Sequence, residues 1–219
     1  MTTASAPSRE ESADEPSGFD RALGQFLLHY KFGLDEMLTK INILREELAF
    51  RGTGSPIEHV SSRLKSIESL RAKAARLGVP LEPLDPDAIG AQINDIAGVR
   101  IVCSFISDAY HVLDMLTTQP DVTVRTIKDY IAHPKPNGYR SLHAIVEVPV
   151  FLSDAARTVP VELQIRTVAM DFWASVEHKI YYKYDKDVPA ELMDELSAAA
   201  RVAHELDARM AELHRTVHG

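Results

Sequence analysis

Apolar side chains recur at helical spacing through the first patterned segment of the chain. From residue 19 to residue 50 an apolar residue stands at about every third or fourth position, and this period predicts one long amphipathic helix. Residues 1–17 are rich in Ser, Ala, Glu and Pro and carry almost no large apolar side chain, so we expect a disordered tail there. We expect residues 18–219 to form a single domain.

The same period predicts a second helix over residues 57–77. Its apolar residues fall on one side when each residue is turned by about 100°. Ser55 is then the expected N-cap, with Pro56 at the first helical position and Gly78 as the C-cap residue.

Beyond a proline-rich linker, short apolar and alternating runs predict strands, and longer periodic segments between and after them predict helices. The strands are expected near 99–105, 122–131, 141–150 and 159–166, and the helices near 108–117, 168–182 and 189–217. This pattern favours an α/β (α+β) fold, with a mixed, roughly five-stranded sheet flanked by helices and long helices near both ends.

Composition narrows the class of protein. The chain has 219 residues, 45% of them hydrophobic, which is enough for one sizeable core. Its net charge of −8 argues against general nucleic-acid binding, so the cations for any phosphate ligand must be concentrated locally. Neither a membrane span nor a signal peptide is visible, and we expect a cytoplasmic protein. The single cysteine, Cys103, lies in an apolar run and is expected in the core.

One stripe of the expected helix 57–77 carries cations and a hydroxyl. Lys65, Ser69, Lys73 and Arg76 fall within about 80° of one another at helical spacing. Such a row can follow a polyphosphate, with each cation neutralising a different phosphate. On the pattern alone, a solvated helix face is the more common explanation of such a row.

The run from Val161 to Arg166 alternates between two kinds of side chain. As a strand it would present Glu162, Gln164 and Arg166 on the face opposite the apolar residues. A carboxylate there could hold Mg²⁺ or accept a proton, although an exposed sheet face would show the same pattern. Asp95 precedes another predicted strand, where an acid in isolation is explained at least as well as a residue that starts a turn. Two carboxylates nevertheless suffice for Mg²⁺ if their strands are neighbours.

The segment 133–143 combines a stiff turn with chemically active side chains. Its two prolines and the pair Asn137-Gly138 specify a tight turn. Tyr139 could stack on a purine while the nearby cations Lys135 and Arg140 meet its phosphates. An incidental hairpin is the alternative, but a structural turn has little use for so many functional groups.

Together these segments resemble the synthetase domain of the RelA/SpoT family, and most closely its stand-alone, RelQ-type small alarmone synthetases. The resemblance covers about residues 40–215. The matching segments are 94–100, 129–132, 135–143, 161–167, 172–178 and 182–184.

The resemblance implies a nucleotidyltransferase-like synthetase fold and a GTP pyrophosphokinase. Such an enzyme transfers the β,γ-diphosphate of ATP to the 3′-hydroxyl of GDP or GTP, with GMP as a further acceptor, and releases AMP. It implies that Asp95 and Glu162 hold Mg²⁺, that Glu162 is the base, that Arg63 and Arg100 enclose adenine, and that Tyr139 stacks on guanine. The remaining implied ATP-binding residues are Lys65, Ser69, Lys73 and Arg76, and the remaining acceptor-binding residues are Lys128, Lys135, Asn137, Arg140, His143 and Gln164.

The family also implies an assembly. RelQ-type enzymes are homotetramers whose central cleft binds alarmone as an activator, using an aromatic residue and an asparagine. This chain has His59 and Asp171 at those places. Because an aspartate repels phosphates, we expect the tetramer but not the activation by (p)ppGpp.

Three other functions fit parts of the sequence. A toxin-type relative would transfer diphosphate to the 3′-CCA end of tRNA or to adenine nucleotides, but it needs a basic patch, which an acidic chain disfavours. A catalytically silent nucleotide sensor or RNA-binding regulator is disfavoured by the intact Asp95 and Glu162. An unrelated interaction protein would require the motif matches to be chance.

Overall fold

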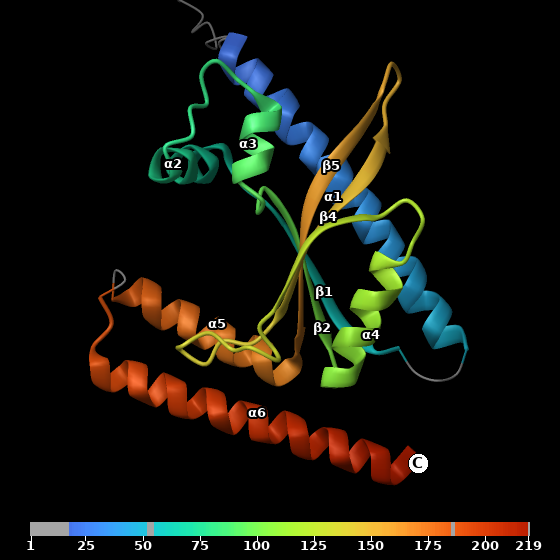
Figure 1. Ribbon diagram of the computed structural model, residues 1–219, viewed down its shortest axis with the longest axis vertical. Helices are drawn as coiled ribbons and strands as arrows, with labels where there is room; N and C mark the ends of the chain where they lie inside the picture. Colours follow the sequence, from blue (N-terminus) through green and yellow to red (C-terminus); the bar gives the residue numbers. More distant parts are fainter. Residues whose placement is uncertain (1–17, 52–54, 185–186, 219) are drawn as a thin grey trace, which may run out of the picture.

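The computed structural model describes residues 18–51, 55–184 and 187–218. The predicted tail at residues 1–17 lies outside this part. In the described part, six helices flank one mixed five-stranded sheet, as Figure 1 shows. The expected fold class is therefore confirmed, including the long helices near both ends.

The sheet joins strands that are distant along the chain. Its order is β1-β2-β5-β4-β3, with β2 and β5 parallel and every other neighbouring pair antiparallel. The parallel register aligns Gly98 with Glu162 and Arg100 with Gln164. The strands are β1 (Ile57–Leu64), β2 (Ala97–Cys103), β3 (Thr123–Asp129), β4 (Leu142–Phe151) and β5 (Ala156–Thr167).

One face of the sheet carries the core. The alternate residues Val161, Leu163 and Ile165 of β5 are buried, and α1 (Gly18–Phe50) and α4 (Ile106–Thr117) pack their apolar sides into the same cluster. Cys103 belongs to this cluster, and burial raises the pKa of its thiol to about 12. The core interpretation of this cysteine is confirmed. Polar residues therefore collect on the opposite face of the sheet.

The predicted helix over 57–77 is wrong in its first half, where the chain forms β1 before α2 (Ile67–Leu77). The register shift between Ile57 and His59 marks a β-bulge. A bulge inserts one residue and changes which face the following residues point to. Ile57 and Val60 consequently share a face although they are three residues apart, a spacing that the sequence presents as helical.

The caps follow from this correction. Ser66, not Ser55, caps α2: its side chain accepts a hydrogen bond from the backbone N–H of Ser69. Gly78 ends the helix in the left-handed conformation, as predicted. The supposed linker also contains a short helix, α3 (Pro86–Gln92), which begins at the N-cap Asp85 with proline at its first turn.

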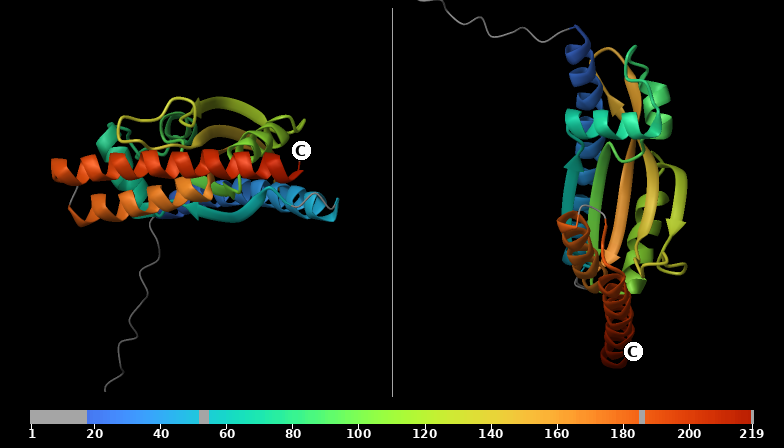
Figure 2. Two further views of the ribbon diagram at one scale, coloured as in Figure 1. Left: turned by 90° about the horizontal axis from the view of Figure 1, so that it is seen from below. Right: turned by 90° about the vertical axis from the view of Figure 1, so that its left-hand side faces the viewer.

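The two C-terminal helices lie side by side across one end of the sheet, as Figures 1 and 2 show. They are α5 (Val168–Lys183) and α6 (Ala190–His218). The buried Asp207 of α6 accepts a hydrogen bond from Thr167, the N-cap of α5, and the indole of Trp173 donates to the carbonyl of Leu196. Among the described residues, no helix combines the length and the apolar character needed to cross a membrane.

Candidate functional site

The polar face of the sheet gathers the predicted residues from separate strands. The register places Arg63 of β1 beside Gly98 of β2, and Gly98 beside Glu162 of β5. A Cβ atom added at Gly98 would lie 3.9 Å from a carboxylate oxygen of Glu162. Position 98 therefore lies directly beside the carboxylate of Glu162.

A cavity of about 210 Å³ opens on this face. We call it the polar cavity. Both predicted carboxylates line it together with cations from β1, the connection to α2, and β2. Its predicted site residues are Arg63, Lys65, Asp95, Arg100, Glu162 and Gln164, and it is completed by Ser61, Ser62, Gly98 and Val99.

Asp95 is held by two lysines. The ammonium of Lys73 lies 2.6 Å from one carboxylate oxygen and that of Lys65 lies 3.2 Å from the other. Burial alone would raise the pKa of Asp95, but the two ammonium groups outweigh burial and keep that pKa below its ordinary value. The carboxylate is therefore ionised at neutral pH, with cations beside it that can also reach a phosphate.

Glu162 belongs to a closed ring of hydrogen bonds. One of its oxygens lies 3.3 Å from Nδ1 of His143, and the other accepts a 3.0 Å hydrogen bond from the amide of Gln164. Nε2 of His143 lies 2.7 Å from the hydroxyl of Tyr139, and the guanidinium of Arg166 donates to both Tyr139 and Gln164, at 2.6 and 2.9 Å. We call these five residues the Arg166 ring.

The ring holds Glu162 as an anion. Burial would raise the pKa of Glu162, and the charge of Asp95 acts in the same direction. The interactions with His143 and Gln164 outweigh both and leave the pKa lowered.

The segment between β3 and β4 forms the predicted tight turn. Gly138 has a positive φ of 88°, and its N–H donates to the carbonyl of Lys135. A Cβ atom at Gly138 would lie 2.5 Å from Ala200 of α6, so this turn packs closely against the C-terminal helix. The ammonium of Lys135 lies 4.6 Å from the ring centroid of Tyr139 and 4.8 Å from that of Tyr130. The turn thus presents an aromatic face next to cations.

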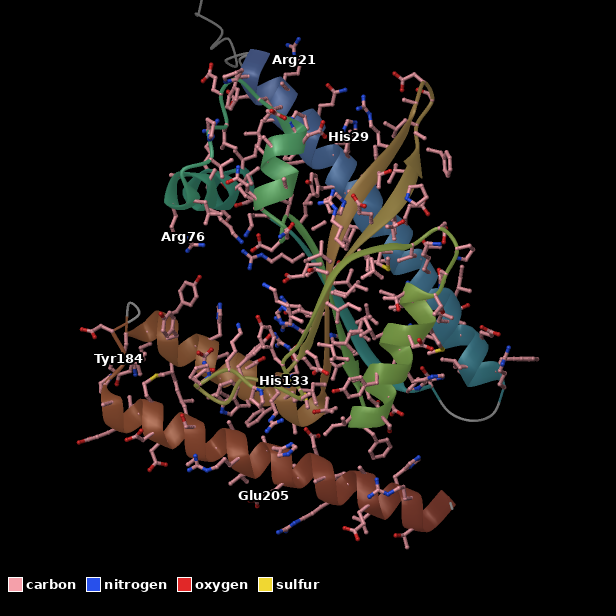
Figure 3. All side chains as sticks on the ribbon, viewed as in Figure 1. Arg21, His29, Arg76, His133, Tyr184 and Glu205 are labelled. Carbon is pink, nitrogen blue, oxygen red and sulfur yellow. The ribbon has the colours of Figure 1, made fainter. Side chains whose placement is uncertain are left out.

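The cationic stripe keeps only part of its predicted form. Lys65 lies before the helix, whereas Ser69, Lys73 and Arg76 remain on α2 at helical spacing. Lys73 reaches Asp95, but neither it, Ser69 nor Arg76 lines the polar cavity. Arg76 extends from α2 on the side that faces α5 in Figure 3.

Three predicted acceptor residues lie at the edge of the site. Lys128 is exposed on β3 and pairs in register with His143. The amide of Asn137 supports the turn by accepting from the N–H of Tyr139 and donating to Glu177. Arg140 turns away from the polar cavity: it donates to the carbonyl of Ile131.

Two residues of the candidate site, Arg166 and Asp171, were not assigned to it from the sequence. The side chain of Arg166 is only 5% exposed, and its other terminal nitrogen lies 3.1 Å from Asp171. Asp171 also lies 3.4 Å from the guanidinium of Arg100, so its charge is balanced within the chain. The expectation that (p)ppGpp does not activate the protein depends on this aspartate and stays a prediction. The strand alternation, which aligns Arg166 with Glu162, was the available signal for the arginine.

The donor set of the polar cavity fits a hard divalent cation. Asp95 and Glu162 offer ionised carboxylates in one cavity, and Mg²⁺ commonly uses one or two protein carboxylates together with substrate phosphates. No group of three or more metal-ligating side chains occurs in the described part of the chain. The cation would therefore have to share its coordination with a ligand.

Comparison with known proteins agrees with this geometry. The family model described as "Region found in RelA / SpoT proteins" matches residues 62–187. The chain is 50% identical over 191 residues to GTP pyrophosphokinase YwaC of Bacillus subtilis, an alignment that covers 87% of this chain and 90% of that protein.

Solved structures give the same result. The small alarmone synthetase 2 from Bacillus subtilis matches with a TM-score of 0.80 and 49% identity, over 89% of this chain and 98% of that one. The small alarmone synthetase 1 from the same organism, bound to its product pppGpp, matches with a TM-score of 0.82 and 36% identity, over 91% and 100% of the two chains. The chain therefore belongs to the RelA/SpoT family.

Proposed function

We propose that the protein is a GTP pyrophosphokinase that moves the β,γ-diphosphate of ATP onto the 3′-hydroxyl of GDP or GTP. The observation that carries this proposal is the meeting of Asp95 and Glu162 in one cavity lined by cations, with Tyr139 joined to Glu162 through His143. Relatives with this activity in their names, and a relative bound to pppGpp, support it.

On the donor side, Arg63 and Arg100 enclose the adenine of ATP. Both line the polar cavity from neighbouring strands. Lys65 and Lys73 meet the ATP phosphates, together with Ser69 and Arg76 of α2. Both lysines contact Asp95, and a nucleotide would offer these ammonium groups phosphate oxygens in addition.

On the acceptor side, the guanine stacks on Tyr139, and Gln164 lies beside the ribose. Lys135 and His143 meet the acceptor phosphates, with Lys128 at the rim. Asn137 and Arg140 act through the shape of the turn, because each hydrogen-bonds within the protein. Stacking on an aromatic side chain contributes about 1–3 kcal/mol per base.

The reaction needs no enzyme nucleophile. The 3′-oxygen attacks the β-phosphorus of ATP, the bond from this phosphorus to the α,β-bridging oxygen breaks, and AMP leaves with that oxygen. Glu162 accepts the proton of the 3′-hydroxyl, which its ionised state permits. Asp95 and Glu162 would hold a divalent cation, Mg²⁺ in this proposal, whose charge stabilises the phosphates when it is bound.

Product analysis tests the activity directly. The purified chain is incubated with ATP, Mg²⁺ and GMP, GDP or GTP in turn, and the nucleotides are separated by anion exchange. We expect AMP together with an equal amount of guanine nucleotide that has gained two phosphates. ADP as the by-product would contradict diphosphate transfer. A parallel reaction with tRNA tests the toxin-type alternative. Modification of the tRNA 3′-CCA end, with no conversion of GMP, GDP or GTP, would favour that alternative.

We further propose that the protein acts in the cytoplasm as a homotetramer. Four large apolar side chains recur along α6 at helical spacing, and each is at least 40% exposed. This stripe suits contact with another copy of the chain; it consists of Val202, Leu206, Met210 and Leu213. Light scattering of the wild type should give four times the monomer mass, and Leu206→Glu with Met210→Glu should lower it. In line with the sequence expectation, added pppGpp should leave the initial rate unchanged.

A further inference from the structure

Arg166 connects the Tyr139 and Gln164 arms of the Arg166 ring, although burying its charge is unfavourable in free energy. It is buried, and its Nε has no hydrogen-bond partner. Burying a guanidinium costs free energy, and replacing a buried ion pair as a whole by well-packed apolar residues is often neutral or favourable. Stability alone therefore does not account for an arginine at this position.

The hydrogen atoms of Arg166 are distributed so that each ring contact has one. A guanidinium only donates hydrogen bonds. The nitrogen that faces the ring has two hydrogens, and it contacts two acceptors, the hydroxyl of Tyr139 and the amide oxygen of Gln164. The other terminal nitrogen contacts Asp171, which supplies the counter-charge.

This donor sets the direction of both arms of the ring. Because the hydroxyl oxygen of Tyr139 accepts from Arg166, its one hydrogen is directed at Nε2 of His143. A neutral His143 then has its proton on Nδ1, directed at Glu162. In the other arm, Gln164 accepts through its oxygen and must donate its N–H to the second oxygen of Glu162.

We propose that Arg166 is a positioning residue for Glu162, acting through Tyr139 and Gln164, with Asp171 as its counter-charge. Both arms end in an N–H donor, one to each carboxylate oxygen. They hold the carboxylate plane in one orientation and leave its remaining lone pairs to the polar cavity. This inference rests on the proposed function, in which Glu162 accepts the proton of the acceptor hydroxyl. Tyr139 thereby joins the surface that binds the acceptor base to the group that receives the proton.

The first test needs neither substrate nor activity. Nitrogen-15 NMR of the nucleotide-free wild type, at about pH 8.5 where an ordinary imidazole is neutral, reports which ring nitrogen of His143 has the proton. We expect Nδ1. A proton on Nε2 would reverse the direction of that arm and overturn the proposal. If no nucleotide is converted in the product assay, the proposed function fails, but this measurement still decides the ring.

The second test is kinetic. Arg166→Met should lower kcat roughly 10–100-fold, as loss of an orienting partner commonly does. Arg166→Lys should remain at least about 10-fold below the wild type, because one ammonium cannot reproduce the planar fork. Full recovery of kcat in Arg166→Lys would mean that Arg166 contributes only its positive charge, and this result would overturn the proposal. Arg125→Met is the matched control: it removes a guanidinium paired with Glu147 outside the polar cavity, and kcat should stay within about twofold, as surface changes remote from the site usually allow.

Tyr139→Phe separates positioning from stacking, since it keeps the aromatic ring and removes one oxygen. Its kcat should fall roughly 10-fold while the KM of the acceptor changes little. In the double variant that also carries Arg166→Met, the combined fold-loss of kcat should be clearly smaller than the product of the two single fold-losses, because both changes break the same arm. Strictly multiplicative losses would overturn the proposal. If Arg166→Met does not fold, an unchanged kcat in Tyr139→Phe would overturn it on its own.

Discussion

The proposed donor side and the proposed acceptor side of the candidate site are organised differently. On the donor side, the flexible ammonium groups of Lys65 and Lys73 pair with Asp95. On the acceptor side, the Arg166 ring fixes Glu162 through short links from β4, β5 and a stiff turn. Lysine side chains can exchange partners when a charged ligand arrives, whereas the ring is preorganised. In the proposed mechanism, movable ammonium groups would meet the phosphates of ATP, whereas Glu162, the proposed proton acceptor, is held in a fixed position.

The largest expected effect comes from the centre of the acceptor side. Glu162→Gln removes the proposed proton acceptor and one of the two carboxylates proposed to hold the cation, and we expect kcat to fall roughly 10²–10⁴-fold. Steady-state rates of AMP formation measure it. Glu147→Gln is the matched control, because it removes a carboxylate that pairs with Arg125 outside the polar cavity. An undiminished rate in Glu162→Gln would remove Glu162 from the mechanism.

Truncating Tyr139, the residue proposed to stack on guanine, tests the comparison through substrate binding. Tyr139→Ala should raise the KM of GDP or GTP roughly 5–150-fold, which corresponds to about 1–3 kcal/mol of lost base stacking. The KM of ATP should change far less, since Tyr139 does not line the polar cavity. Equal increases in the KM of ATP and the KM of the guanine nucleotide would contradict the division of the site into a donor side and an acceptor side.

The donor side is expected to respond more weakly to a single change. Lys65→Met should raise the KM of ATP roughly 10-fold, about the value of one charge-assisted hydrogen bond, because Lys73 still reaches Asp95. Lys40→Met, which breaks another lysine–aspartate pair, with Asp121, is the control and should leave the KM of ATP unchanged. A larger effect of Lys65→Met on GTP than on ATP would contradict the assignment.

The smallest expected effect is on the pH dependence of stability. The lowered pKa of Asp95 in the folded chain means that its ion pairs stabilise the protein above the ordinary carboxyl pKa, about 3.9, and lose this contribution as the pH falls through the folded value. Urea unfolding at pH 6 and pH 3 should therefore show a smaller loss of stability in Asp95→Asn than in the wild type.

Asp207→Asn provides a control of opposite sign. Burial raises the pKa of Asp207, although Thr167 opposes the shift, so the folded chain binds a proton there more readily than the unfolded chain. Stability from this group rises as the pH falls, and Asp207→Asn should remove that rise. The same change of slope in both variants would show that the two carboxyl groups are not distinguished by their surroundings.

Much of the fold was predictable because regular periods dominate it. The helix at 19–50, the alternation in β5 and the turn at Asn137-Gly138 depend on local geometry, and all were found where the sequence indicated. The false helix at the start of 57–77 had a local cause as well: a β-bulge at Ile57 to His59 produced helical spacing in an edge strand. α3 had a usable signal, an aspartate N-cap followed by proline, but it is only seven residues long.

The candidate site was likewise predictable from the sequence only in part. Its chemically active residues were named from motifs, and the alternation of β5 aligned Glu162 with Gln164 and Arg166. No local pattern indicates that β2 and β5 are parallel neighbours, that both lysines meet on Asp95, or that Arg140 turns away. These facts depend on contacts between residues 9 to 64 positions apart, which have no period along the chain.

The sequence by itself determined the class of fold, the family and the types of side chain available for phosphate chemistry, because period, turn chemistry and motif order are properties of neighbouring residues. Only the tertiary structure decided that Asp95 and Glu162 share a cavity and that Arg166 connects Tyr139 to Gln164. The physical reason is that strand order and register bring distant side chains within hydrogen-bonding distance, and both are settled by burial of the whole sheet rather than by any one segment.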